Sequence, residues 1–426
     1  MKVQLLSSLN DRNVDVAQAS SQRQLAISVS AIADQVDQRL PLNLCLILDK
    51  SGSMHGKPMQ TVIAAVEQLL NKLQPGDRIS IVAFSGSAEV IVPHQVIQDT
   101  STIKSLLPNK LIASGGTAIA AGLELGITEL MQGAKGAVSQ AFLLTDGHGE
   151  TSLRLWKWEI GTDDTKRCLE LAQKAAKINL TINTLGFGNN WNSDLLEKIA
   201  DAGGGSLAYI EHPEQVLEQF GRLFGRITSI GLTNAYLQFS FAPHVRLAEL
   251  KPIAQVFPDT IELPVQPATN GGFAVRLGDL MQNVERVVLV NLYLGQFPAG
   301  EQVIGQMQIR YDDPALKQEC LLTPMVTISA NFVHKYQPAL NPQVQQSILA
   351  LAKYRQTQLA EMKLQHGDRI GAATMLQTAA NTALQIGDTN AANVLQTSAT
   401  RLQAGEQLSS AELKKTRIVS KTILQT

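Results

Sequence analysis

Between Leu42 and Arg226, short apolar stretches alternate with segments of helical periodicity, and this alternation constrains the fold more than any other feature. Strands that alternate with helices form βαβ units, so we predict a doubly wound, mostly parallel, Rossmann-like sheet with helices on both faces. Only Ser-Gly-Ser separates the second and third strands, which predicts a hairpin and one antiparallel edge strand. The predicted strands are 43–48, 78–84, 88–93, 140–145, 180–187 and 207–210, and the predicted helices are 58–73, 117–131, 165–177, 192–202 and 213–227.

The patterns on either side of this α/β domain, which we assign to residues 40–226, are different. Residues 1–39 contain one alternating stretch, 23–34, which indicates a strand. Residues 227–336 contain strand-like stretches separated by Pro, Gly and Asn, and they predict a β-sandwich. The strand at 23–34 can belong to this sandwich, in which case the α/β domain is an insertion between its two parts.

The last part of the chain, residues 337–426, has the periodicity of helices. Within it, residues 367–379 and 387–399 resemble each other, and each begins with Gly-Asp, whose carboxylate can cap the helix that follows. Two related helical units suggest a tetratricopeptide-like segment. An ordinary helical bundle explains the same pattern, and the sequence leaves both interpretations open.

The composition excludes several classes of protein. With 44% hydrophobic and 17% charged residues and a net charge of −1, the chain is typical of a folded domain without bulk attraction to nucleic acid or anionic membranes. The three cysteines are few and far apart, which fits a reducing compartment. The sequence contains neither a secretory signal nor a run of about 20 apolar residues that could span a membrane. We therefore expect a cytoplasmic protein.

The first apolar strand of the α/β domain, Leu44–Leu48, stops abruptly at Asp49, and two hydroxyl residues, Ser51 and Ser53, follow. In a doubly wound sheet, ligands bind beyond the carboxyl ends of the strands, which is where Asp49 should lie. Carboxylate and hydroxyl oxygens are hard ligands that suit Mg²⁺, Mn²⁺ or Ca²⁺ and not zinc or copper. The alternative is that Asp49 only caps the helix predicted at 58–73.

Two later positions could complete an oxygen coordination shell. Thr117 follows a Gly-Gly pair at the start of a predicted helix, and Asp146 follows the buried strand predicted at 140–145 and precedes a glycine. Both should lie at the same edge of the sheet as Asp49.

These residues resemble the metal-ion-dependent adhesion site (MIDAS) of the von Willebrand factor type A (VWA) family, which consists of Asp-x-Ser-x-Ser, then a Thr, then an Asp before Gly. The resemblance covers about residues 40–226, and the flanking parts are similar to the stand-alone bacterial members in general arrangement. It implies a non-enzymatic protein that binds Mg²⁺, or Mn²⁺ or Ca²⁺, and uses the ion to bind an exposed Asp or Glu of a partner protein. All five ligand positions of an intact site are present, as Asp49, Ser51, Ser53, Thr117 and Asp146.

Two other functions are alternatives to this one. An enzyme could use the same metal for phosphoryl or ester hydrolysis, but the sequence offers no general base or nucleophile beyond the ligands. The chain could instead be a substrate-presenting or regulatory subunit of an AAA+ ATPase complex of the chaperone or chelatase type. It has no phosphate-loop motif, so the ATPase would be a separate protein.

Three tryptophans lie in loops that should leave the sheet at the metal edge. Trp156 and Trp158 follow Asp146, and Trp191 follows the strand predicted at 180–187. Tryptophan is enriched among interface hot spots, so we predict that these side chains form a partner-contact rim around the metal. The alternative is that they pack the loops onto the domain.

Overall fold

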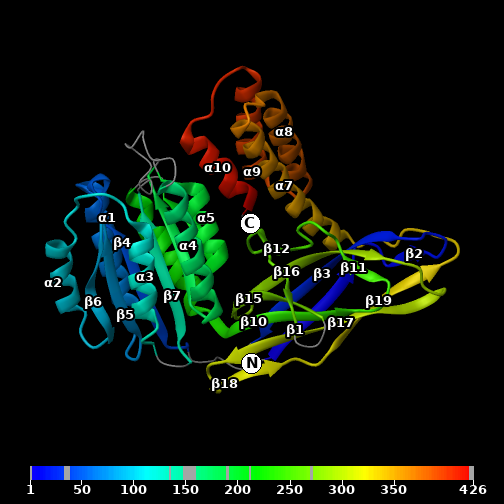
Figure 1. The fold of residues 1–426 in the computed structure, drawn as a ribbon, viewed down its shortest axis with the longest axis horizontal. Helices are drawn as coiled ribbons and strands as arrows, with labels where there is room; N and C mark the ends of the chain where they lie inside the picture. Colours follow the sequence, from blue (N-terminus) through cyan, green and yellow to red (C-terminus); the bar gives the residue numbers. More distant parts are fainter. Residues whose placement is uncertain are drawn as a thin grey trace. The chain divides into compact units, whose positions relative to one another are not determined.

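The computed structural model describes residues 2–32, 39–133, 136–146, 160–188, 191–210, 213–268 and 272–421 (Figure 1). The chain separates into two compact units. Unit 1 comprises Met1–Gln35, Ala235–Tyr311 and Cys320–Thr426, and unit 2 comprises Val36–Asn234 and Asp312–Glu319. Unit 2 therefore interrupts unit 1 along the sequence. None of the described helices is long and apolar enough to cross a membrane.

Unit 2 contains a six-stranded sheet with the strand order β6-β5-β4-β7-β8-β9. All neighbouring strands are parallel except β5 and β6, so the prediction of a mixed α/β sheet with one antiparallel edge strand is confirmed. The chain order reverses at β4, and the carboxyl ends of β4 and β7 flank the switch point. The strands are β4 (Leu42–Asp49), β5 (Arg78–Phe84), β6 (Ala88–Val96), β7 (Val138–Thr145), β8 (Thr181–Phe187) and β9 (Gly204–Ile210).

Helices cover both faces of this sheet. Every residue of β4 is therefore buried, whichever face its side chain points to. On one face, Cys45 and Ile47 share a hydrophobic core with residues of α3, α4 and α5. On the other face, Phe142 of β7 contacts Phe220 of α6 with ring centroids 6.1 Å apart. The helices are α1 (Lys57–Lys72), α2 (Ser101–Lys110), α3 (Ile119–Leu130), α4 (Ile160–Lys177), α5 (Ser193–Gly203) and α6 (Val216–Thr228), with short 3-10 turns η1 (Gly52–Met54) and η2 (Pro213–Gln215).

One helix of unit 2, α2, has no counterpart among the predicted helices. It buries only Ile103 and Leu107 and contains Pro108 in its last turn, so its sequence carries little helical periodicity.

Helix α3 lies unusually close to the sheet. A Cβ atom on Gly122 would lie 2.7 Å from the ring of Phe84, and one on Gly126 would lie 2.4 Å from Ile47. The absence of side chains at these two positions allows the close approach. It fixes the start of α3, and with it the preceding loop that carries Thr117, against the ends of β4 and β5.

Unit 1 contains two β-sheets in the region where we predict a β-sandwich. The six-stranded sheet has the order β1-β3-β16-β12-β13, with β11 also paired to β16, and the seven-stranded sheet has the order β14-β15-β10-β17-β19-β2, with β18 paired to β17. The alternating stretch at 23–34 lies in β3, which pairs with β1 and β16. The strands are β1 (Lys2–Leu9), β2 (Asn13–Asp15), β3 (Ser21–Ile32), β10 (Ile230–Phe241), β11 (Val245–Leu247), β12 (Ile253–Phe257), β13 (Ile261–Glu262), β14 (Gln266–Pro267), β15 (Phe273–Met281), β16 (Glu285–Leu294), β17 (Gly300–Asp313), β18 (Gln318–Leu322) and β19 (Val326–Val333).

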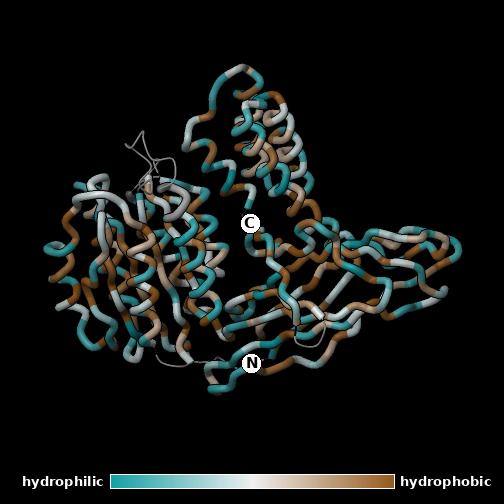
Figure 2. Tube along the Cα trace, in the orientation of Figure 1, coloured by the Kyte–Doolittle hydropathy of each residue, from teal (hydrophilic) through white to brown (hydrophobic). Residues whose placement is uncertain are grey.

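The C-terminal part of unit 1 is helical, as predicted, and begins with a helix that packs on the six-stranded sheet. Val344, Leu351 and Tyr354 of α7 share a core with residues of β12 and β16. Asp368 and Asp388 accept hydrogen bonds from the N–H groups of the first turns of α8 and α9, so both predicted helix caps are confirmed. Figure 2 shows hydrophobic residues along the strands of both units and mixed hydropathy along these helices. The helices are α7 (Pro342–Gln365), α8 (Arg369–Gln385), α9 (Thr389–Gln403) and α10 (Ser410–Lys421).

Candidate metal-binding site

Asp49 is the last residue of β4, and its side chain is completely buried. One carboxylate oxygen, Oδ1, accepts the backbone N–H of Ser51 at 2.7 Å. The other, Oδ2, accepts the hydroxyl of Thr145, the last residue of the neighbouring strand β7. The carboxylate is thus fixed both by its own turn and by the adjacent strand end. Thr145 was not among the predicted site residues; its only signal in the sequence is its position directly before Asp146.

The turn after β4 brings three more of the predicted residues together. The hydroxyl oxygens of Ser51 and Ser53 are 3.0 Å apart, and the Ser53 hydroxyl donates to Oδ1 of Asp146 at 2.7 Å. Asp49, Ser51, Ser53 and Asp146 are therefore joined by a chain of hydrogen bonds that links the carboxyl ends of β4 and β7. Ser51 is buried and Ser53 is exposed, so the chain of hydroxyls runs from the interior to the surface.

The fifth predicted residue, Thr117, lies in the loop before α3. Three backbone hydrogen bonds hold this loop: Gly52 N–H donates to the Gly115 carbonyl at 3.1 Å, Ser114 N–H to that of Lys50 at 2.8 Å, and Ala118 N–H to that of Ser85 at 2.6 Å. Two of these bonds connect the loop to the turn that carries Ser51 and Ser53. Thr117 itself is 8% exposed and lies two residues from the Gly115 contact.

The electrostatics of the two carboxylates are unusual for surface aspartates. Burial raises the pKa of Asp49, although hydrogen bonds from Thr145 and Ser51 oppose this effect. Burial also raises the pKa of Asp146, to about 6. The hydrogen bond from Ser53 lowers this pKa, and the negative charge of Asp49 raises it further. Within the part of the chain that the structure describes, neither carboxylate forms an ion pair. A cation placed between them would offset both the desolvation and the mutual repulsion.

This donor set fits a hard divalent cation. It consists of two carboxylates and three hydroxyls, which are the oxygen ligands that Mg²⁺, Mn²⁺ and Ca²⁺ prefer. Over the described residues, no group of three or more His, Cys, Asp or Glu side chains lies close enough together to hold a metal ion.

Lys50, between Asp49 and Ser51, does not contact the carboxylates of the site. Its ammonium group instead forms an ion pair with Glu89 of β6. This pairing turns the lysine away from the site and leaves its carboxylates without a cation from the same turn.

Trp191 does not form a contact rim, and this part of the prediction is wrong. Its side chain is 1% exposed, and its indole N–H donates to the Gly188 carbonyl at 2.9 Å. Its ring packs against that of Tyr209, with the ring centroids 5.6 Å apart. The indole fills the space above Gly186, where a Cβ atom would lie only 2.2 Å from the ring. Trp191 therefore anchors its loop to the domain. Trp156 and Trp158 lie outside the described residues.

Comparison with protein families gives two matches, one within each unit of the chain. The model for the von Willebrand factor type A domain matches residues 43–222, and the model for the "Sll0103-like, C-terminal alpha-helical domain" matches residues 342–426. The first match contains the strand ends and loops described above, and the second coincides with α7 to α10.

Among proteins of similar sequence, sll0103 from Synechocystis sp. is 51% identical over 426 residues, which is 100% of this chain and 98% of the relative. YfbK from Escherichia coli is 30% identical over 182 residues, but these are only 42% of this chain and 30% of YfbK. Similarity thus extends over the whole chain in the first case and over less than half of it in the second.

Two solved structures share the fold across nearly the whole chain. A von Willebrand factor type A protein from Catenulispora acidiphila superposes with a TM-score of 0.80 at 19% identity and covers 99% of this chain and 97% of its own. The ArnB paralog VWA2 from Sulfolobus acidocaldarius has a TM-score of 0.56 at 15% identity, with 98% of both chains covered. At these identities the likeness concerns the fold alone.

Proposed function

Because the chain belongs to the same family as sll0103 and contains a von Willebrand factor type A domain, we propose that it is a non-enzymatic, metal-dependent protein-binding protein. The proposed ligands form a MIDAS that would hold Mg²⁺, or Mn²⁺ or Ca²⁺, and would bind an exposed Asp or Glu of a partner. These ligands are Asp49, Ser51, Ser53, Thr117 and Asp146.

The observation that carries this proposal is the hydrogen bond of 2.7 Å between the Ser53 hydroxyl and the Asp146 carboxylate. These residues are 93 positions apart in sequence, yet their oxygen atoms meet at the switch point of the sheet. Binding sites of doubly wound sheets lie at this point. Oxygen ligands that already lie within hydrogen-bonding distance need little rearrangement to share one cation.

The chain's own residues have distinct tasks in this proposal. Thr145 and the Ser51 N–H orient the carboxylate of Asp49, and the Gly52–Gly115 hydrogen bond keeps the Thr117 loop beside the serine turn. Because three of the five ligands are neutral hydroxyls, the protein contributes a charge of only about −2 to a divalent ion. A bound ion would therefore keep enough electrophilicity to accept a carboxylate from outside.

The chemical identity of the hydrogen-bonded groups at this edge of the sheet supports a non-enzymatic role. The described side chains that meet there are carboxylates and hydroxyls that all serve as ligands or orient a ligand, which leaves no group among them to act as a general base. A cytoplasmic location remains a prediction from the sequence.

The proposal is tested by titrating the protein with Mn²⁺ and following binding by electron paramagnetic resonance. Ser53→Ala should weaken Mn²⁺ binding about tenfold, since a charge-bearing hydrogen bond and one oxygen ligand are lost together. Ser87→Ala is the matched control, because Ser87 is also an exposed serine in a turn at the same sheet edge, between β5 and β6. Equal affinities in the wild type and Ser53→Ala would contradict the proposed ligand set.

Partner binding needs a second measurement. Proteins captured by the immobilised full chain should be released by EDTA and recaptured when Mg²⁺ is added in excess, and Asp49→Ala should capture none of them. If the same partners remain bound under all these conditions, recognition does not pass through the metal.

A further inference from the structure

The six-stranded sheet of unit 1 has one long edge strand, β1, which runs over eight residues from Lys2 to Leu9. The outermost strands at the other ends of the two sheets, β13, β14 and β2, have only two, two and three residues. Edge strands are usually blunted by shortness, prolines, bulges or charges, because an open edge invites pairing with another chain. β1 has no proline and no register shift, and its single charged residue is the first one, Lys2.

The backbone of β1 alternates between bonding to β3 and pointing to the open side. The Asn10 N–H donates to the Gln24 carbonyl at 2.8 Å, which continues the register in which Leu9 lies opposite Leu25. In an antiparallel pair, hydrogen-bonded positions alternate, so the even-numbered residues of β1 bond to β3. The N–H and C=O groups of Val3, Leu5, Ser7 and Leu9 therefore point to the open edge, where no described strand pairs with them.

The chain itself adds an extended segment to the continuation of this edge. Leu340 forms an antiparallel bridge with Asp11, and the Asn341 N–H donates to the Asn10 carbonyl at 2.9 Å. This segment is held in place by Asp11, which accepts the Tyr336 hydroxyl and the Ala339 N–H. The segment ends before it reaches β1, because Asn341 caps α7 and the chain turns away at Pro342.

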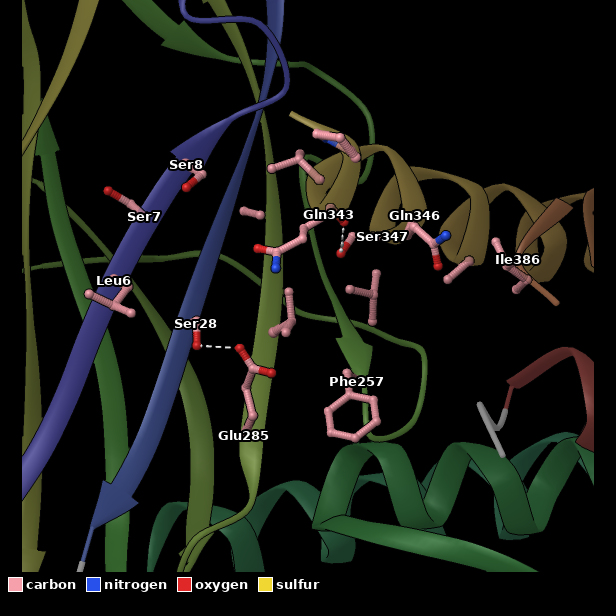
Figure 3. Close-up of a pocket in the computed structure, with 16 residues that line it drawn as sticks. Leu6, Ser7, Ser8, Ser28, Phe257, Glu285, Gln343, Gln346, Ser347 and Ile386 are labelled. Carbon is pink, nitrogen blue, oxygen red and sulfur yellow. Dashed lines mark hydrogen bonds between the residues drawn. The ribbon is translucent and has the colours of Figure 1, made fainter. Parts of the chain in front are cut away.

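Two cavities flank the open edge of β1, one on each face of the sheet. A cavity of about 590 Å³ lies between the first turns of α7 and the face of the sheet that carries Leu6 and Val287, which we call the outer face (Figure 3). A cavity of about 660 Å³ lies on the other side, beside Leu25 and Ile328. Both cavities are lined in part by Ser7 and Ser8 of β1 and by Pro342 and Gln343 of α7.

We propose that the open edge of β1 binds an extended segment of a partner polypeptide, which adds to the sheet as an antiparallel strand beyond residues 339–341. Successive side chains of a strand point to opposite faces, so an added strand directs its side chains alternately into the two cavities. Its backbone bonds to the outward-pointing groups of β1, in the manner of β-strand addition. This surface belongs to unit 1 and does not use the metal site.

The cavity linings define the chemistry of the segment. The outer cavity exposes the aliphatic side chains of Leu6, which is 54% exposed, and Val287, and its lining carries one charged group, the carboxylate of Glu285. In Figure 3, Glu285 and Ser28 lie side by side, joined by a hydrogen bond, at one side of the cavity. The other cavity has a mixed lining, with the hydroxyls of Thr327 and Ser329 beside apolar residues and Arg12. The segment therefore directs aliphatic residues and one basic residue, beside Glu285, to the outer cavity, and alternates them with uncharged residues that face the mixed lining of the other cavity.

The test uses a phage-displayed library of random peptides as the probe and the immobilised full chain as the target. Selected peptides should show the alternation described above, and EDTA should not affect their binding. Ser7→Pro should weaken their binding about tenfold, since it removes one outward N–H and obstructs the edge. Ser7→Ala, which keeps the backbone donor, should change the affinity less than about twofold.

Hydrogen exchange shows whether the mutation acts at the edge itself. Binding of a selected peptide should slow exchange of the Leu5, Ser7 and Leu9 amides and leave that of Leu6, which already bonds to β3, unchanged. Proline is tolerated in edge strands where the N–H faces outward, and unchanged Mn²⁺ binding and thermal unfolding of Ser7→Pro verify the fold. The proposal is overturned if no selected peptide distinguishes the two Ser7 variants, if protection appears elsewhere, or if β1 pairs with β1 of a second copy.

Discussion

Two carboxylates with little solvent exposure, Asp49 in unit 2 and Asp388 in unit 1, differ in the charge of their hydrogen-bond donors. Asp388 caps α9 and receives the ammonium group of Lys353 at 2.7 Å, with both side chains less than 10% exposed. Asp49 is fully buried but receives only neutral hydrogen-bond donors from the described residues. Lys50, the nearest lysine in sequence, pairs with Glu89 instead.

The difference concerns where the compensating cation comes from. A buried charge is costly unless it is paired, and Asp388 finds its partner within the chain. The carboxylates of Asp49 and Asp146 lack such a partner among the described residues, and burial raises the pKa of both. A folded chain that keeps this arrangement is prepared for a cation from solution, which is the physical basis of the proposed metal site.

The largest expected effect is on stability at Asp388. Asp388→Ala should lower the free energy of unfolding by about 3–5 kcal/mol, because it leaves the ammonium group of Lys353 buried without its partner. Asp368→Ala is the matched control at the equivalent position of the related helix, where the ion pair with Lys363 is much more exposed than the pair of Asp388 and Lys353. Asp368→Ala should lower the free energy of unfolding less than Asp388→Ala, because it removes a helix cap but leaves no buried charge without a partner. Urea unfolding followed by circular dichroism measures both, and equal costs would contradict the internal pairing.

Asp49→Asn should affect stability in the opposite way to Asp388→Ala. In EDTA it should leave the free energy of unfolding unchanged or raise it, because a buried charge without a cation is removed and the side chain keeps its shape. With Mg²⁺ at about 100 times its dissociation constant, the free energy of unfolding of the wild type should rise by about 2.7 kcal/mol, and that of the variant should not change. Thermal unfolding with and without Mg²⁺ checks this. A large loss of stability in EDTA would mean that Asp49 serves the fold and not a ligand.

Packing near the metal edge gives the next effect in size. Gly186→Ala should lower the free energy of unfolding by about 1–3 kcal/mol, since its methyl group would overlap the Trp191 indole. Gly225→Ala in α6 is the control, because a Cβ atom there meets nothing within 4 Å. If both variants have the same stability, measured by thermal unfolding, Trp191 does not anchor its loop as described.

The smallest effect is expected at Lys363, whose ion pair with Asp368 is exposed at 34% and 46%. Lys363→Ala should change the free energy of unfolding by less than about 1 kcal/mol, as is usual for surface ion pairs. Urea unfolding in low and high salt measures it. If Lys363→Ala lowers the free energy of unfolding as much as Asp388→Ala does, then burial does not explain the difference between the two ion pairs at the starts of α8 and α9.

Several features were predictable because they depend on local chemistry. Apolar runs such as Leu44–Leu48 are readable as buried strands, and the rule that ligands bind at strand ends was enough to select Asp49, Ser53 and Asp146. The Gly-Asp pairs before α8 and α9 predicted their caps for the same reason. In contrast, α2 was missed because two buried residues leave little periodicity, and β1 because its sequence, KVQLLSSL, does not alternate clearly.

The sequence by itself determined which residues could bind a metal, since carboxylates and hydroxyls after strands are visible in the chain. Only the tertiary structure decided that Thr145 holds Asp49, that Trp191 is buried over Gly186, and that Lys353 neutralises Asp388. It also decided that, among the described strands, none pairs with the outer edge of β1 between the two cavities. The physical reason is that residue type fixes the chemistry of a group, whereas its burial and its partners depend on segments that are distant in sequence and meet only in the folded chain.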